Sequence, residues 1–129
     1  MTEFIFLQIE VVKALHKMQI ERFGGAHGLR DEGILESALN RPVNKAGYGV
    51  DDVCELAAAY LFGLARNHAF VDGNKRIAIV TAGVFLMENG YMIETDEATL
   101  YTFVLGVATG EIDEEGACLF LKDHVVPLG

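Results

Sequence analysis

Apolar residues recur at helical spacing in two long segments in the middle of the chain. Between residues 52 and 65 they are separated by three or four positions, which places them on one face of a helix. Residues 77–87 are almost wholly apolar and precede Asn89-Gly90, a pattern typical of a buried helix and its C-terminal end. The pattern therefore predicts two helices joined by a short polar loop, a helix-loop-helix elbow.

Four more helices are predicted around this pair. They cover about residues 8–23, 31–41, 96–108 and 113–123. Gly24-Gly25 should end the first, and Pro42 should end the second because proline cannot continue a helix without losing a backbone hydrogen bond. Residues 91–93 are predicted to be a short extended piece and residues 43–50 a mobile loop. The expected fold class is all-α, a compact helical bundle in a single domain over residues 1–129.

Composition agrees with a folded domain. The chain has 51% hydrophobic residues and only two prolines, which argues against disorder. It has no stretch of about 18 uninterrupted apolar residues, and its opening segment lacks the basic residues of a signal peptide. Cys54 and Cys118 fall on apolar helix faces and are expected to be small buried side chains rather than a disulfide or a metal site. We expect a cytoplasmic protein with no membrane partner.

Acidic residues outnumber basic ones, and the formal net charge is −9. This charge disfavours direct binding to nucleic acid. Carboxylates near a helix start are stabilised by the helix dipole, and four acidic groups stand at predicted helix starts. These groups are Asp31-Glu32, Asp51-Asp52, Asp96-Glu97 and Asp113-Glu114-Glu115. We therefore interpret them as helix starts rather than as a functional acidic surface.

The loop between the two central helices, residues 68–76, reads His-Ala-Phe-Val-Asp-Gly-Asn-Lys-Arg. With Arg66 just before it, the region holds three of the chain's ten Lys and Arg residues. Gly73 would let the backbone turn tightly, and Asn74 is expected to cap the following helix. Free N–H groups at that helix start would then lie beside Lys75 and Arg76 and favour a phosphate group. The loop is therefore predicted to bind an anion.

Two other side chains of the loop suit acid–base chemistry. A histidine titrates near neutral pH, so His68 can accept a proton from an attacking hydroxyl. Asp72 can orient that histidine, hold a substrate hydroxyl, or place an oxygen on Mg²⁺ beside the phosphates of a nucleotide. Phe70 is expected to point into the core. A lone histidine is more often structural, but a structural elbow needs no clustered cations beside an Asp-Gly-Asn sequence.

The pattern His-x-Phe-x-Asp-Gly-Asn-Lys-Arg resembles the signature loop of the Fic superfamily. It is most similar to the Doc (death-on-curing) branch, the toxins of prokaryotic type II toxin–antitoxin pairs. The resemblance covers nearly the whole chain and implies a compact Fic/Doc-like helical bundle. Matching segments include Leu15-His16, residues 21–25, 30–33 and 35–39, Arg41-Pro42, and residues 64–68 and 108–111.

The resemblance also implies a reaction. His68 would be the general base that removes the proton from a serine or threonine hydroxyl of a target protein. Asp72 would contact Mg²⁺ or orient that hydroxyl, and Arg76 would stabilise charge in the transition state. The implied phosphate- and nucleotide-binding residues are Gly73, Asn74, Lys75, Arg76 and Arg66. For Arg66 a second interpretation stays open, an ion pair with a carboxylate on the neighbouring helix.

One departure from the Fic pattern bears on the reaction. Typical Fic adenylyltransferases read Gly-Asn-Gly-Arg where this chain reads Gly73-Asn74-Lys75-Arg76. The lysine resembles Doc, whose family activity is transfer of the terminal phosphate of ATP to elongation factor Tu, which arrests translation. Gly73, however, is the Fic-like residue where the Doc toxin has alanine. We therefore expect phosphoryl transfer from ATP, with adenylyl transfer as the alternative.

The predicted loop at residues 43–50 contains Gly47-Tyr48-Gly49. By resemblance it matches the flap that, in Fic-type proteins, pairs with an extended segment of the target protein. An ordinary connecting loop is an equally good interpretation, because tyrosine between glycines is common in loops.

A protein partner is expected as well. Many Fic proteins carry an inhibitory helix with the pattern Ser/Thr-x-x-x-Glu-Gly/Asn. In this sequence Thr109 is followed four positions later by Asp113, and Ser37 by Arg41. Neither stretch has the glutamate of that pattern, so inhibition is expected from an antitoxin encoded beside the toxin. A segment of the antitoxin would fold into a groove next to the elbow.

Two alternatives come from other classes of protein. The chain would be an idle module if it bound nucleotide or protein without transferring any group. It would be a metal-dependent hydrolase if His68 and Asp72 held a metal, but too few further ligands are visible nearby. His16, His27 and His124 show no metal-ligand spacing, and His16 is expected to pack or to form a hydrogen bond.

Overall fold

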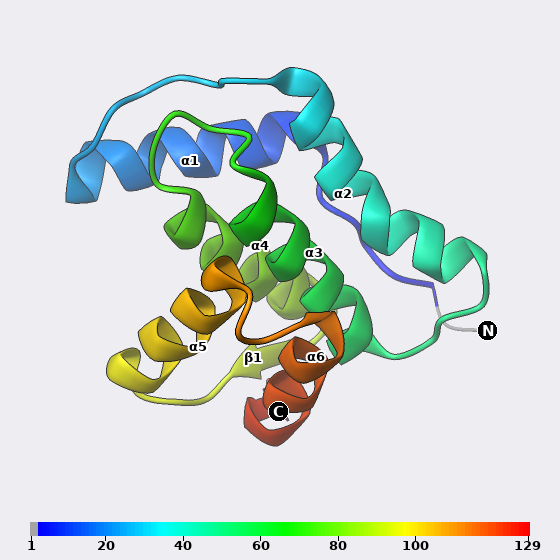
Figure 1. Cartoon of the computed structure of the whole chain (residues 1–129). Coiled ribbons are helices and arrows are strands. Elements are labelled where there is room, and N and C mark those ends of the chain that lie inside the picture. Colours follow the sequence, from blue (N-terminus) through cyan, green and yellow to red (C-terminus); the bar gives the residue numbers. More distant parts are fainter. Residues whose placement is uncertain (1–2) are drawn as a thin grey trace.

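The computed structural model describes residues 3–129. Within that part of the chain, six helices form a bundle and two short strands pair with each other (Figure 1). The elements are α1 (Ile9–Phe23), α2 (Glu32–Gly47), α3 (Val53–Asn67), α4 (Asn74–Glu88), β1 (Tyr91–Ile93), α5 (Glu97–Thr109), α6 (Glu114–His124) and β2 (Val125–Pro127). The predicted all-α class is confirmed. The same helices include none with the length and apolar character needed to cross a membrane.

Helix α3 is the centre of the bundle and packs against α2, α4, α5 and α6 (Figure 1). It is buried on several faces, as expected of a helix that is apolar almost all round. Small residues allow its neighbours to come close: a Cβ added at Gly63 would lie 3.3 Å from the Cβ of Ala38 in α2. Because this helix is fixed in the core, its last residue, Asn67, fixes where the loop of residues 68–73 begins.

Four helices begin at the aspartates that the sequence indicated. The side chains of Asp31, Asp52, Asp96 and Asp113 each accept a hydrogen bond from a backbone N–H in the first turn that follows. Helix α4 begins differently. Its N-cap is Gly73, which forms no side-chain cap, and Asn74 is already the first helical residue. The prediction that Asn74 caps α4 is therefore wrong.

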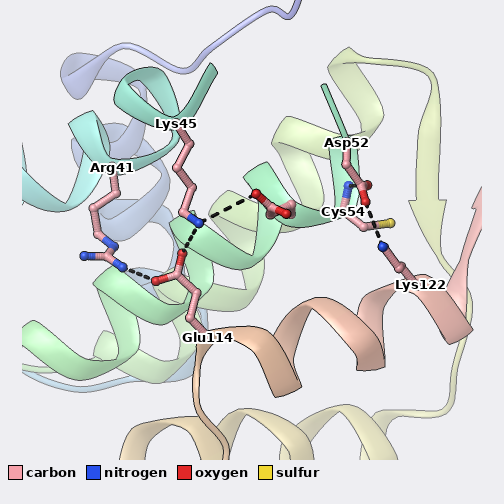
Figure 2. A network of polar contacts seen from close by, with 7 residues as sticks. Arg41, Lys45, Asp52, Cys54, Glu114 and Lys122 are labelled. Carbon is pink, nitrogen blue, oxygen red and sulfur yellow. Dashed lines mark hydrogen bonds and ion pairs between the residues drawn. The ribbon is translucent and has the colours of Figure 1, made fainter. Parts of the chain in front are cut away.

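The predicted end of the second helix at Pro42 is also wrong. Helix α2 continues through Pro42, which is buried, to Gly47. One lost hydrogen bond is outweighed by contacts that the last turns make elsewhere. Arg41 pairs with Glu114 of α6, and Lys45 Nζ lies 3.1 Å from Glu114 and 3.8 Å from Glu55 of α3 (Figure 2). Residues 43–47, predicted to be loop, are therefore helical.

The two strands form an antiparallel pair in which Met92 faces Val126. The sequence predicted β1 but not β2, because β2 follows α6 directly with no turn residue to mark it. The two cysteines behave as predicted: Cys54 and Cys118 are buried and free. Burial raises the pKa of the Cys54 thiol to about 11, so it is an unreactive apolar side chain at neutral pH.

Candidate active site

The loop of residues 68–73 lies at the C-terminal end of α3, below the segment that joins α1 to α2 (Figure 1). It borders a cavity of about 990 Å³. The cavity is lined by the end of α1, the loop, and the facing sides of α4 and α5. Its residues are Gln19, Arg22, Phe23, His68, Val71–Arg76, Ile79, Val80, Glu97, Leu100, Tyr101 and Val104. The structure thus brings together His68, Asp72, Gly73, Asn74, Lys75 and Arg76 around one space.

His68 has an unusual backbone conformation. Its φ and ψ are 51° and 52°, and it is the one residue other than glycine with a positive φ between residues 3 and 129. This left-handed turn stops α3 and leaves the imidazole exposed at the cavity. Non-glycine residues held in this region carry strain, and such residues cluster at functional sites. The exposed imidazole is free to meet a substrate hydroxyl.

The Asn74 side chain forms hydrogen bonds with the backbone of the loop and does not cap a helix. Its Oδ1 accepts from the Phe70 N–H at 3.1 Å, and its Nδ2 donates to the Phe70 carbonyl at 3.0 Å. Phe70 itself is buried, with 3% of its surface exposed, as the sequence predicted. The backbone on either side of Asp72 is therefore tied into a closed turn.

Gly73 supplies the sharp turn into α4. Its φ is 74°, and a Cβ at this position would lie 3.1 Å from Ile20 Cδ1. The first N–H groups of a helix have no partner within the helix, and the first bond back into this turn runs from Ile77 N–H to the Gly73 carbonyl. The N–H groups at residues 74–76 are therefore open, and binding of an anion there stays a prediction.

The Asp72 carboxylate is held by backbone donors from both sides. Ala26 N–H donates to Oδ2 at 3.2 Å and Gly73 N–H to Oδ1 at 2.8 Å. These bonds, with the nearby charge of Arg76, lower the pKa of Asp72 below its ordinary value of 3.8. Asp72 is therefore an anion at neutral pH.

The Asp72 carboxylate has free acceptor capacity for Mg²⁺. Each of its oxygens accepts one N–H and keeps a second lone pair for another contact. Between residues 3 and 129 no group of three or more His, Cys, Asp or Glu side chains is placed to hold a metal. One ionised carboxylate at a cavity fits an Mg²⁺ ion that takes its other ligands from water and nucleotide phosphates.

The two cations of the loop are placed differently. Lys75 is exposed at the cavity. Arg76 points back to α1, where it donates to the Gln19 carbonyl at 3.3 Å and the Gly24 carbonyl at 2.9 Å. Its guanidinium has five N–H donors, so it can hold the end of α1 and still offer a donor to the cavity.

Arg66 is separate from this group. Among the described residues the cavity lining does not include it. Its guanidinium carbon lies 5.4 Å from the centre of the Phe62 ring, a cation–π contact. It also lies against Gly110 at the end of α5. The structure therefore does not bring Arg66 to the predicted phosphate site.

Gly47, Tyr48 and Gly49 are also far from the loop. They precede α3, whereas His68 follows it, and the 15 residues of α3 span about 22 Å at 1.5 Å per residue. Tyr48 is 92% exposed. The structure does not bring the predicted flap and the predicted base together.

A different segment, residues 24–31, takes the place beside the loop. Val71 N–H donates to the Gly28 carbonyl at 3.0 Å, and Arg30 N–H donates to the Ala69 carbonyl at 2.8 Å. Leu29 and Phe70 form an antiparallel bridge. We call residues 24–31 the strap. Its glycines at positions 24, 25 and 28 all have positive φ. In the sequence Gly24-Gly25 indicated only the end of the first helix.

Other residues of the cavity lining carry no sequence signal for the site. Arg22, in the last turn of α1, adds a cation to the cavity lining. Helix α5 adds Glu97, Leu100 and Tyr101. Periodicity marked these residues as helical, but it could not show which helices meet around the loop.

Comparison with known proteins defines the class. A family model described as "Fic/DOC family" matches residues 6–86. The protein "Protein kinase doc" of Escherichia phage P1 is 39% identical over 104 residues, which cover 80% of this chain and 82% of that protein. "Toxin Doc" of Mycolicibacterium smegmatis is 49% identical over 77 residues, covering 57% of this chain and 58% of that protein. The chain therefore belongs to the Fic/DOC family, in its Doc branch, and the predicted membership is confirmed.

Proposed function

We propose that the chain is the toxin of a type II toxin–antitoxin pair and transfers the terminal phosphoryl group of ATP to a serine or threonine hydroxyl of a target protein. The observation that carries the proposal is the strained, exposed His68, which faces the same cavity as Asp72, Lys75 and the open N-terminus of α4. The names of the two relatives, a protein kinase and a toxin, support the same reaction and role.

The reaction begins at His68. Its imidazole takes the proton of the target hydroxyl, and the hydroxyl oxygen forms a bond to the terminal phosphorus of ATP. The bond from that phosphorus to the bridging oxygen breaks, and ADP leaves with the electron pair. The phosphorylated target then departs, and His68 returns its proton to water.

The charge on the transferred group needs fixed donors around it. The N–H groups at residues 74–76 and the ammonium of Lys75 supply them from the loop, and Arg22 supplies a cation from the end of α1. Arg76 keeps the end of α1 close enough for Arg22 to take part. Asp72 would hold Mg²⁺, which, when bound, offsets negative charge on the phosphates.

Lys75 favours phosphoryl over adenylyl transfer. An adenylyltransferase must place the diphosphate leaving group near the start of α4, where a glycine leaves space. In this chain that position carries a long charged side chain that lines the cavity. Gly73 keeps adenylyl transfer as the second candidate, because it provides the backbone turn found in the Fic pattern.

The strap suits the target protein better than Gly47-Tyr48-Gly49. An extended segment that pairs with the loop on one edge has a second edge for an extended peptide. A hydroxyl residue in such a peptide would lie near His68. Elongation factor Tu is the first target to test, and it would place the toxin's action in the cytoplasm.

We propose that the antitoxin binds where the cavity is lined by α4 and α5. There the cavity continues over apolar residues of α4 and α5, which are Ile79, Val80, Leu100, Tyr101 and Val104. An amphipathic antitoxin segment can bury its apolar face on this wall and cover the phosphate site.

The experiment combines the purified protein, purified elongation factor Tu and ATP, followed by intact-protein mass spectrometry. One added phosphoryl group on the target supports the proposal, and an added adenylyl group refutes it. His68→Ala should abolish the modification and keep the fold, whereas His124→Ala, at the far end of α6, should keep both. An unmodified target in a lysate with labelled ATP, together with measurable nucleotide binding, would favour the idle module.

A further inference from the structure

We propose that His16 is a positioning residue that sets the conformation of the active-site loop. It lies in α1, is 3% exposed, and places Nε2 at 2.7 Å from the Asp72 carbonyl oxygen. Its ring also stacks on Phe70, with centroids 3.8 Å apart and planes at 12°. The proposal rests on the proposed phosphoryl transfer, because it assigns His16 to the same loop.

The partner fixes which nitrogen carries the proton. A carbonyl oxygen only accepts hydrogen bonds, so Nε2 must be the donor. Nε2 of His16 therefore carries a hydrogen. A side chain that cannot donate at the Nε2 position would leave the Asp72 carbonyl without this bond.

His16 acts on the groups that the reaction needs. The bonds from Asn74 and from His16 reach residues 70 and 72 of the same turn, and the Ala26 N–H holds the carboxylate of Asp72. A Cβ at Gly73 would lie 3.6 Å from His16 Nε2, so the ring also packs close to the turn into α4. Loss of this support would move the Asp72 carboxylate and the open N–H groups of α4 together.

The geometry separates this role from direct catalysis. In the described part of the chain, the residues that line the cavity include Asp72 and Gly73 but not His16. His16 therefore touches neither nucleotide nor target, and it works through its contacts with Phe70 and Asp72. Small errors in the placement of reacting groups lower the rate strongly, so kcat should respond more than KM.

Two substitutions separate the hydrogen bond from simple packing. His16→Leu keeps an apolar side chain of similar bulk and removes the donor. His16→Gln carries an N–H donor the same number of bonds from Cα as Nε2. The chain offers a matched control in His124, whose Nδ1 lies 2.7 Å from the Phe120 carbonyl and whose ring stacks on Phe120 at 4.0 Å, away from the loop.

We expect His16→Leu to lower kcat by roughly 100-fold, with KM for the target unchanged. His16→Gln should recover most of kcat, and His124→Leu should keep kcat at the wild-type level even where its melting temperature falls. Equal kcat in His16→Leu and wild type, or no recovery in a folded His16→Gln protein, would overturn the assignment.

Nuclear magnetic resonance gives a test that needs no activity. The wild-type His16 ring should show a slowly exchanging hydrogen on Nε2, and the Gly73 amide should change its chemical shift in His16→Leu but much less in His16→Gln. A ring whose Nε2 carries no hydrogen would overturn the proposal even if His16→Leu fails to fold. If the wild-type protein phosphorylates no target, the proposed function fails, and these spectra alone decide the role of His16.

Discussion

The side chain of Asn74 holds the backbone of Phe70 by two hydrogen bonds, one to its N–H at 3.1 Å and one to its carbonyl at 3.0 Å. An amide side chain is one of the few that can donate and accept in this way. The pair closes the turn that contains Asp72 and ends where α4 begins. Asn74 therefore shapes the proposed anion site without being the N-cap that its position suggested.

We predict that Asn74→Asp, which keeps the acceptor and loses the donor, destabilises the fold by about 1–2 kcal/mol, and that Asn74→Ala costs more because both partners on Phe70 lose their bonds. Urea denaturation measures both changes. Asn40→Ala, an exposed site on α2, should have no such cost. Equal stabilities for the Asn40 and Asn74 variants would show that the closed turn adds little to the fold.

Local signals predicted much of this fold, and long-range contacts account for the errors. The four aspartate caps, the buried central helices and the clustering of the loop residues all follow from short sequence patterns. Pro42 misled because Arg41 and Lys45 pair with Glu114, which is distant in sequence, and Lys45 also pairs with Glu55 of the next helix. These ion pairs hold the turn after Pro42 in a helix. The strap and Arg22 were missed because only the packed structure shows which segments border the loop.

Gly25 and Gly24 provide a matched test of the strap. Both have a positive φ, so an alanine at either site strains the backbone. A Cβ at Gly25 would lie 2.7 Å from Asp72 Oδ2, whereas a Cβ at Gly24 meets nothing within 4 Å. Gly25→Ala should therefore reduce phosphoryl transfer to the target. Gly24→Ala should preserve this transfer, although its folding stability should be similar to that of Gly25→Ala.

Asp72 gives a prediction about pH. The N–H groups of Ala26 and Gly73 and the charge of Arg76 lower its pKa in the folded state, so the ionised form stabilises the fold above the unfolded-state pKa. This stabilisation should be lost as the pH falls from 3.8, the ordinary pKa of an aspartate, through the lower pKa of Asp72 in the folded state. A carboxyl titration followed by carbon-13 magnetic resonance should find the pKa of Asp72 below 3.8 in the wild type. In Gly25→Ala the pKa should be closer to 3.8. A wild-type pKa at or above the ordinary value would contradict the hydrogen-bonding pattern.

Glu114 and Glu115 test the ionic network that keeps α2 helical beyond Pro42. Both lie in the first turn of α6, so glutamine at either site loses the same favourable interaction with the helix dipole. Only Glu114 pairs with Arg41 and Lys45, and its side chain is 19% exposed. We expect Glu114→Gln to lower the free energy of unfolding by about 1–2 kcal/mol more than Glu115→Gln. Equal effects in urea denaturation would mean that the ion pairs do not hold the last turns of α2.

Arg22 is predicted to contribute to phosphate binding from outside the loop. Arg22→Gln should weaken nucleotide binding roughly tenfold, the loss expected for one charge-assisted hydrogen bond. Arg30→Gln, on the exposed side of the strap, changes the net charge equally and is the control. Isothermal titration calorimetry with ATP measures both, and a loss of affinity that is equal in the two variants would point to net charge instead of a contact at the cavity.

We predict that Lys75 decides between the two proposed transfer reactions. In Lys75→Gly the sequence becomes Gly-Asn-Gly-Arg, and the space at the start of α4 that the lysine occupies opens to a diphosphate. Phosphoryl transfer should fall because a cation near the terminal phosphate is lost, and adenylyl transfer should become detectable because Gly73 already provides the turn. Lys75→Ala separates the two effects, since it removes the charge while the backbone at this position stays less adaptable than with glycine. Mass spectrometry of the target distinguishes the products. Adenylyl transfer by the wild type, or undiminished phosphoryl transfer by both variants, would show that Lys75 does not set the orientation of ATP.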